Sequence, residues 1–173
     1  GEVESVVFGD PKLVKRTLSV RTSQYEELSL GATPKVVAGS CNYGTNGTVS
    51  GKVFPNFLFL TSFSNRQFVT FDVRRWDNFK AEIGMSDRSE YKFDNLTIEV
   101  DGQEVKQFPI VYGSKSFSIV IPVKGHQTLT LVTKGTAALI GNARLSRGTD
   151  PNSNANLTFS SEEIGNSDLN NQS

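Results

Sequence analysis

Few residues of this chain could carry out nucleophilic or acid–base chemistry. It contains one histidine, His126, and one cysteine, Cys41. A Ser-His-Asp triad would have to use His126, which lies in a predicted turn (residues 124–127), where a histidine more often simply faces water. Cys41 lies in a predicted loop (residues 39–44) without the base or helix N-terminus that activates a thiol. These two residues cannot build the usual zinc site either. We therefore expect no catalytic residues and a protein that is not an enzyme.

Carboxylates offer two further kinds of site. A pair of them can cleave a glycosidic bond even from distant positions in the chain, but most acids here fall in predicted turns or on polar strand faces, as Asp101 and Glu82 do. Asp87 and Asp94 could offer oxygen ligands to Ca²⁺, although no calcium-loop spacing is present. We therefore expect no cofactor, with a structural calcium ion as the one alternative.

Four aromatic residues are the more promising binding groups. Tyr43, Tyr91 and Tyr112 each lie beside predicted turn residues, and Trp76 lies between two predicted strands. Flat rings in polar loops can stack on the apolar faces of sugars while neighbouring polar groups bond the hydroxyls. The alternative is that Trp76 caps the fold and the tyrosines anchor ordinary loops. We take these four residues as candidate contacts for a glycan or a protein.

Charge and hydropathy exclude several classes of protein. The chain has 173 residues, with 18 Lys plus Arg against 18 Asp plus Glu. Net neutrality argues against a dedicated nucleic-acid binder. Phe68, Phe71 and Trp76 do lie near arginines, but Phe71 falls on the inward face of a predicted strand. The longest apolar run, residues 57–60, is far too short to span a membrane.

The charge is unevenly divided along the chain. Residues 148–173 contain four acidic and no basic residues, so residues 1–147 carry a net charge of +4. We expect three parts: an N-terminal extension (1–30) that adds a strand near residues 13–20 or a short helix over 24–30, a folded body (31–147) and a polar acidic tail (148–173). Because the chain opens with Gly1, we interpret it as a processed or excised segment. An extracytoplasmic or cell-surface location is favoured over others.

Hydrophobic residues in the body alternate with a period of two. Clear runs cover residues 69–73, 79–85, 96–100, 117–123 and 129–131, and Gly-containing pairs such as Asn46-Gly47 and Asp101-Gly102 read as turns between runs. Asp101-Gly102 is the strongest hairpin signal. Such spacing predicts an all-β fold, an antiparallel β-sandwich or jelly roll.

The order of these runs resembles the NPCBM-like family of jelly-roll carbohydrate-binding modules. The resemblance is carried by residues 69–73 with 76–87, the predicted hairpin 96–105, the turn and strand 123–132, a closing strand at 143–145 and an earlier strand at 49–54. Members often carry a glycine-rich segment with a histidine before the first of these, whereas this chain has Pro55-Asn56-Phe57-Leu58 there. No binding residue is therefore transferred from the family.

Together these observations favour a non-catalytic carbohydrate-binding module that is an accessory part of a larger protein. The alternative is a β-sandwich domain for protein–protein interaction or scaffolding, in which the same loops contact a polypeptide.

Overall fold

The computed structural model describes residues 24–31, 36–61 and 65–151. These residues form strands and turns without a helix, which confirms the predicted all-β class. The strands are β1 (Glu26–Ser29), β2 (Val36–Gly39), β3 (Cys41–Val49), β4 (Lys52–Leu60), β5 (Gln67–Asp72), β6 (Asn78–Met85), β7 (Phe93–Val100), β8 (Gln103–Val111), β9 (Phe117–Pro122), β10 (Thr128–Thr133) and β11 (Ala138–Arg147).

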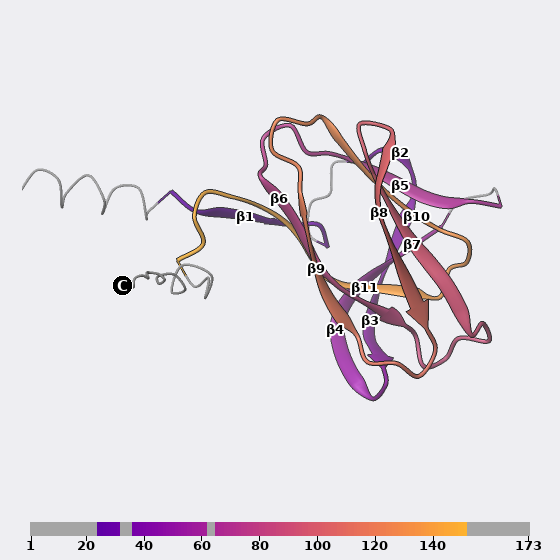
Figure 1. The fold of residues 1–173 in the computed structure, drawn as a ribbon. Helices are drawn as coiled ribbons and strands as arrows, with labels where there is room; N and C mark the ends of the chain where they lie inside the picture. The colour runs from indigo at the N-terminus through magenta and orange to yellow at the C-terminus, as the bar shows by residue number, and fades with distance from the viewer. Residues whose placement is uncertain (1–23, 32–35, 62–64, 152–173) are drawn as a thin grey trace, which may run out of the picture. The chain divides into compact units, whose positions relative to one another are not determined.

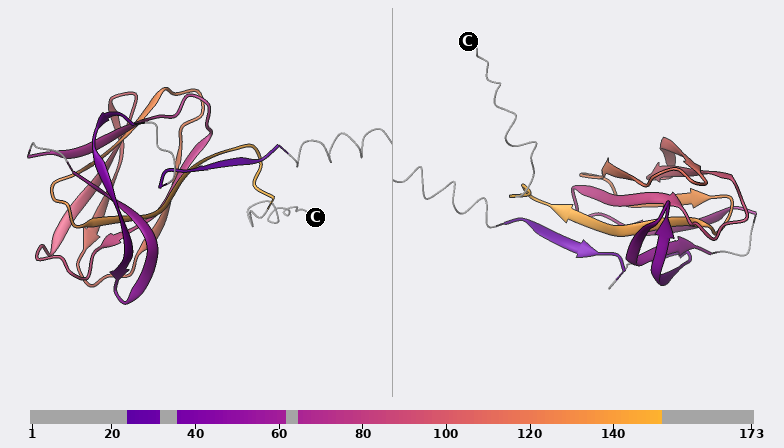
Figure 2. Two further views of the ribbon diagram at one scale, coloured as in Figure 1. Left: turned by 180° about the vertical axis from the view of Figure 1, so that it is seen from behind. Right: turned by 90° about the horizontal axis from the view of Figure 1, so that it is seen from below.

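The strands form two antiparallel sheets that pack as a sandwich. Sheet A has the order β3-β4-β11-β6-β9, and β1 also pairs with β11. Sheet B has the order β2-β5-β10-β7-β8. In Figure 1, β6 and β9 of sheet A lie to the left of β7 and β8 of sheet B. The right-hand view of Figure 2 shows the strands stacked in layers.

The core lies between the sheets and follows the period-two pattern of the sequence. Phe79 and Ile83 of β6 are fully buried, as are Phe71 of β5 and Leu129 and Leu131 of β10. Because successive side chains of a strand point to opposite faces, each of these strands offers one apolar row to the core. The predicted inward position of Phe71 is thus confirmed.

The β7–β8 hairpin confirms the strongest turn signal. Asp101 and Gly102 both have positive φ, 51° and 82°, as a type I′ turn requires. The Asp101 carboxylate accepts hydrogen bonds from the backbone N–H groups of Gln127 and Thr128, at 2.9 and 3.0 Å. It also bonds Nδ1 of His126 at 2.9 Å, which holds the pKa of Asp101 below its usual value. His126 lies in the β9–β10 turn, as predicted, half exposed to solvent.

Two predictions for the β3–β4 region are wrong. Asn46-Gly47 is not a turn between strands but lies inside β3, and the expected strand over 49–54 is interrupted by the tight turn Ser50-Gly51 (φ 47° and 83°). Asn46 does take the left-handed conformation that its pairing with glycine suggests, with φ of 56°. Pairing simply continues past it, so Cys41 and Tyr43 also lie in a strand rather than in a loop.

The chain near β1 is extended. The short helix considered for residues 24–30 is wrong, because Glu26–Ser29 is a strand and the Leu30 N–H donates to the Ala143 carbonyl at 2.9 Å. The alternative strand near residues 13–20 lies outside the described residues. Residues Glu27–Arg147 make up one compact unit, and the described residues 24–26 and 148–151 belong to another. Within the described ranges, no helix is long and apolar enough to cross a membrane.

Candidate functional site

Sheet A carries a small apolar cluster on its outer face, the face that points away from sheet B. Ile140 of β11 is buried in the core, so its neighbour Gly141 faces outward. A Cβ at Gly141 would overlap the ring of Phe54, which therefore lies directly on the β11 backbone. Phe54 is only 4% exposed and packs with Val49, Leu139 and the half-buried Phe57. An outward sheet face is normally polar, so this cluster marks an unusual surface.

The cluster forms because the alternation of inward-facing and outward-facing side chains shifts by one residue partway along the β3–β4 hairpin. Phe54 has the same sequence parity as the core residue Leu58 yet packs on the opposite face. The change occurs at left-handed Asn46, which lies opposite Pro55, between the pairs Thr45–Asn56 and Gly47–Phe54. The hairpin tip therefore turns its aromatic residue outward.

A β-bulge in β11 opens a gap beside this cluster. The register of β11 with β6 shifts between Gly141 and Arg144, and Asn142 has a positive φ of 51°. Before the bulge, β11 pairs with β4 at Ile140 and Gly141. After the bulge, β1 replaces β4 as the strand that pairs with β11 on this side. Bulges of this kind end pairing and are common next to functional sites.

The gap between β4 and the end of β1 holds a cavity of about 650 Å³, which we call the sheet pocket. This volume lies within the range of typical small-molecule sites. The pocket is lined by Ser29 and Gly31 after β1, Tyr43–Thr45 of β3, Lys52–Leu58 of β4, Glu82 of β6, and Asn142 and Ala143 of β11. Three aromatic rings, those of Tyr43, Phe54 and Phe57, therefore share one cavity with several polar side chains.

The charged groups of the sheet pocket neutralise one another. Nζ of Lys52 lies 2.6 Å from Oε2 of Glu82 and 5.3 Å from the centre of the Phe54 ring. Oε2 of Glu82 also accepts a hydrogen bond from the Ser116 hydroxyl at 2.5 Å. The hydrogen bond from Lys52, followed by that from Ser116, lowers the pKa of Glu82. Glu82 is thus a fixed carboxylate rather than an acid poised to give up a proton.

The amide groups of the pocket are available for a ligand. Asn56 and Asn142 are exposed, and neither side chain has a hydrogen-bond partner within the part of the chain that the structure describes. Each amide offers both a donor and an acceptor. Amides beside aromatic rings are a combination that can bind hydroxyl groups and the apolar face of one molecule together.

Tyr43 is the predicted contact residue that reaches the sheet pocket. Its side chain is 44% exposed, and its hydroxyl accepts a weak hydrogen bond from the Cys41 thiol at 3.7 Å. Burial, and then the bond with Cys41, raise the pKa of Tyr43, so its hydroxyl stays protonated. Burial also raises the pKa of the Cys41 thiol, which is the opposite of what a nucleophile needs.

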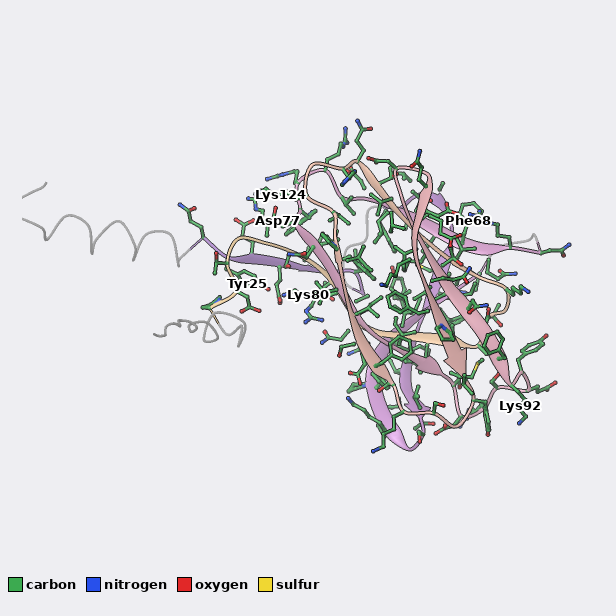
Figure 3. The ribbon with its side chains drawn as sticks, viewed as in Figure 1. Tyr25, Phe68, Asp77, Lys80, Lys92 and Lys124 are labelled. Atoms are coloured by element: carbon green, nitrogen blue, oxygen red, sulfur yellow. The ribbon has the colours of Figure 1, made fainter. Side chains whose placement is uncertain are left out.

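The other three predicted aromatics lie elsewhere. Trp76 is in the β5–β6 loop next to Asp77, partly buried against the core, with the Arg147 guanidinium 5.8 Å from its ring centre. Tyr91 precedes Lys92 in the β6–β7 loop and is 64% exposed. Figure 3 shows Asp77 and Lys92 at opposite ends of the sandwich. The structure therefore does not gather Trp76 and Tyr91 into one patch.

Tyr112 lies near Tyr91 but serves the fold. Its hydroxyl donates to the Asp87 carbonyl at 3.0 Å, and its backbone N–H donates to the Lys92 carbonyl at 3.0 Å. The Lys92 ammonium lies 4.0 Å from the centre of its ring. With hydroxyl and one ring face engaged, Tyr112 has less to offer a ligand than Tyr43.

The two aspartates considered for calcium hold turns together. Asp87 accepts hydrogen bonds from the N–H groups of Ser50 and Gly51, at 2.7 and 3.0 Å, and these bonds, led by that from Gly51, lower its pKa. Asp94 accepts from the N–H groups of Lys134 and Gly135, at 3.1 and 3.0 Å. Among the described residues no three potential metal ligands of the His, Cys, Asp or Glu type lie together.

Sequence reasoning missed Phe54, Phe57, Asn56 and Asn142. In the sequence, Phe57 belongs to the apolar run 57–60, and Phe54 belongs to the strand expected over residues 49–54. Neither feature by itself indicates a binding residue. Glycines at 44, 47 and 141 were a usable signal, since small residues on strands permit close approach by a ring. Their partners were not visible, because only tertiary pairing brings β4 next to β11.

Comparison with solved structures shows which known proteins share this architecture. A CBM51 module from Clostridium perfringens GH95, solved with methyl-galactose, matches with a TM-score of 0.53 at 13% identity, over 69% of this chain and 99% of that one. The tandem CBM51 modules of a Streptococcus pneumoniae family 98 glycoside hydrolase match with a TM-score of 0.59 at 12% identity, over 75% of this chain and 50% of theirs. The chain has the fold of a carbohydrate-binding module.

A third match agrees with this fold. The CBM51-2 and INT domains of Clostridium perfringens ZmpB, solved with GlcNAc, give a TM-score of 0.54 at 14% identity over 72% of this chain. The CBM-type sandwich spans about a third of that structure and half of the tandem modules. No family model matches the sequence, and no curated protein does either. The NPCBM-like assignment therefore stays a prediction, while the broader jelly-roll, CBM-type fold is established.

Proposed function

We infer that this protein is a non-catalytic carbohydrate-binding module, an accessory part of a larger protein, and that it holds its sugar in the sheet pocket. The observation that carries this proposal is the composition of the pocket. Tyr43 and Phe57 bring accessible aromatic surface, with the buried Phe54 ring beside them, to the same cavity as the amides of Asn56 and Asn142, which bond to none of the described residues. The fold it shares with modules solved with GlcNAc and methyl-galactose supports the same class of ligand.

The chemistry of the pocket supports binding without reaction. Glycoside hydrolysis normally uses two carboxyl groups, one of them with a raised pKa. Among the described residues that line the sheet pocket there is one carboxylate, Glu82, and its pKa is lowered by Lys52 and Ser116. A single ion-paired carboxylate can orient a sugar hydroxyl but is a poor general acid. We accordingly assign the predicted body, residues 31–147, as the binding module, together with residues 27–30, because Leu30 is a core residue and Ser29 lines the pocket. The remaining residues at either end are its extensions.

A printed glycan array followed by calorimetry tests the proposal. The wild-type chain is screened first, and the sugar retained is titrated into Asn56→Ala, Tyr43→Ala and the control Tyr91→Ala. Removing the Asn56 amide is expected to weaken binding by about tenfold, the effect of one hydrogen bond that is no longer made in a partly buried site. Tyr91 is exposed and outside the pocket, so Tyr91→Ala is expected to bind as the wild type does.

The results separate the possible sites. Retention on no glycan would overturn the carbohydrate proposal and leave the protein-interaction hypothesis. Retention that is lost in Tyr91→Ala but kept in Asn56→Ala would place the ligand at the loops instead. Melting temperatures close to that of the wild type are required of each variant, since neither Asn56 nor Tyr91 belongs to the core.

A further inference from the structure

We propose that the ligand is an oligosaccharide of at least two units that crosses Phe57, and that the unit beyond Phe57 carries an anionic substituent, a carboxylate or a sulfate, bound by Arg88. This inference rests on the proposed function and specifies its ligand. It starts from a second cavity on sheet A that adjoins the sheet pocket.

The second cavity, of about 270 Å³, shares Phe57 with the sheet pocket. Phe59 lies two residues along β4, on the same face of the strand, with its ring centre 6.1 Å from that of Phe57. Both rings are partly exposed and both line the second cavity. A ligand that leaves the sheet pocket over Phe57 thus meets another aromatic surface instead of open solvent. This arrangement suits a chain of rings better than a single one.

The polar lining of the second cavity comes from two loops. Ser86, Arg88 and Ser89 come from the β6–β7 loop, and Thr136 comes from the loop between β10 and β11. The serine hydroxyls are used within their own loop: Ser86 accepts from the Arg88 N–H, and Ser89 bonds the backbone of Tyr91. The Arg88 guanidinium is exposed and has no partner among the described residues. It is therefore available to bind a ligand.

The charge balance of the two cavities differs. In the sheet pocket Lys52 and Glu82 form an ion pair and cancel. Arg88 is the charged residue that lines the second cavity, and the carboxylate of adjacent Asp87 is already bound by the N–H groups of Ser50 and Gly51. Among the described residues that line the second cavity, Arg88 thus carries a positive charge that no carboxylate balances. A guanidinium binds planar carboxylates and sulfate-like oxyanions through paired N–H donors, which a neutral sugar cannot match.

The test uses a printed array of oligosaccharides of one to four units in neutral, uronate-bearing and sulfated forms. Hits are titrated by calorimetry against the full chain and the variants Arg88→Gln, Phe59→Ala and Lys134→Gln. Acidic two-unit sugars are expected to bind about tenfold more tightly than their neutral forms. The substitution Arg88→Gln should abolish this difference in affinity, and 0.5 M salt should reduce it. Phe59→Ala should weaken two-unit sugars and leave single units unchanged. Lys134→Gln removes a cation outside both cavities and should change nothing.

The uronate and sulfate arms show which oxyanion the site prefers, and either one supports the proposal. If single neutral sugars bind as tightly as acidic oligosaccharides, the inference is overturned while the proposed function stands. If acidic sugars bind better but Arg88→Gln keeps that preference, the assignment of Arg88 is overturned. If no sugar binds at all, the proposed function fails as well. Arg88 and Phe59 lie outside the main core, so both variants should fold, which melting curves verify.

Discussion

The outward-facing cluster of sheet A rests on the close contact between Gly141 and Phe54, which the substitution Gly141→Ala tests directly. An alanine in a strand interior is ordinarily about 0.5–1 kcal/mol better than glycine. Here the new methyl group would overlap the ring of Phe54, which is 4% exposed and has little room to move. Overpacking of this kind costs about 1–3 kcal/mol. The net expectation is a loss of about 1–2 kcal/mol in the free energy of unfolding, or a melting temperature lower by about 3–8 °C.

A double-mutant cycle assigns the effect to the ring. In a Phe54→Ala background the overlap disappears, so adding Gly141→Ala should stabilise the protein by about 0.5–1 kcal/mol. Urea denaturation of the four proteins gives the coupling between the two sites, expected near 2 kcal/mol. Gly135→Ala is the matched control, because a Cβ at Gly135 meets no atom closer than 3.6 Å and its φ is not positive. It is expected to be neutral or slightly stabilising.

The reasoning would be refuted if Gly141→Ala stabilised the protein equally in both backgrounds. That result would mean that Phe54 does not lie on the β11 backbone, and the sheet pocket would lose one of its walls.

Three further predictions concern acid stability, thiol reactivity and the core. The folded-state pKa of Asp87 is lowered, so its stabilising contribution is complete above about pH 4 and is lost as the pH falls through the folded pKa. The difference in unfolding free energy between the wild type and Asp87→Asn should therefore shrink as the pH is lowered from 6 to 2.5. A difference that stays constant over this range would contradict the role assigned to Asp87. Cys41, with its raised pKa, should react with a disulfide reagent at pH 8 at least about tenfold more slowly when folded than in urea; equal rates would show that the thiol is open. Leu131→Ala, at a fully buried position, should cost about 2–5 kcal/mol in urea denaturation, and a loss below 1 kcal/mol would argue against the assigned core.

The sequence predicted strands and their inward faces well because this information is local. Alternation over residues 79–85 and 129–131 marks one apolar row per strand, and each row is buried as expected. Asp101-Gly102 forms its hairpin turn because only a few residue pairs accept two positive φ angles. The same logic misled at Asn46-Gly47, where a left-handed residue is present but the strand continues through it.

The candidate site was predicted only in part. Tyr43 reaches the sheet pocket, although from a strand rather than a loop. Trp76 and Tyr112 are engaged with the fold, through Arg147 and the core in one case and through Asp87 and Lys92 in the other. A ring beside turn residues looks the same in sequence whether it anchors a loop or contacts a ligand. Which of the two it does depends on neighbours contributed by distant segments.

By itself, then, the sequence determined the all-β class, the inward faces and the scarcity of catalytic side chains, since composition and period-two patterning are properties of the chain alone. The tertiary structure decided where a ligand can bind. The sheet pocket exists for two reasons. At the bulge around Asn142 the pairing partner of β11 changes from β4 to β1, and the glycine at 141 leaves room for the Phe54 ring. Both effects depend on which strands are neighbours, and strand order follows from packing the whole sandwich rather than from any local pattern.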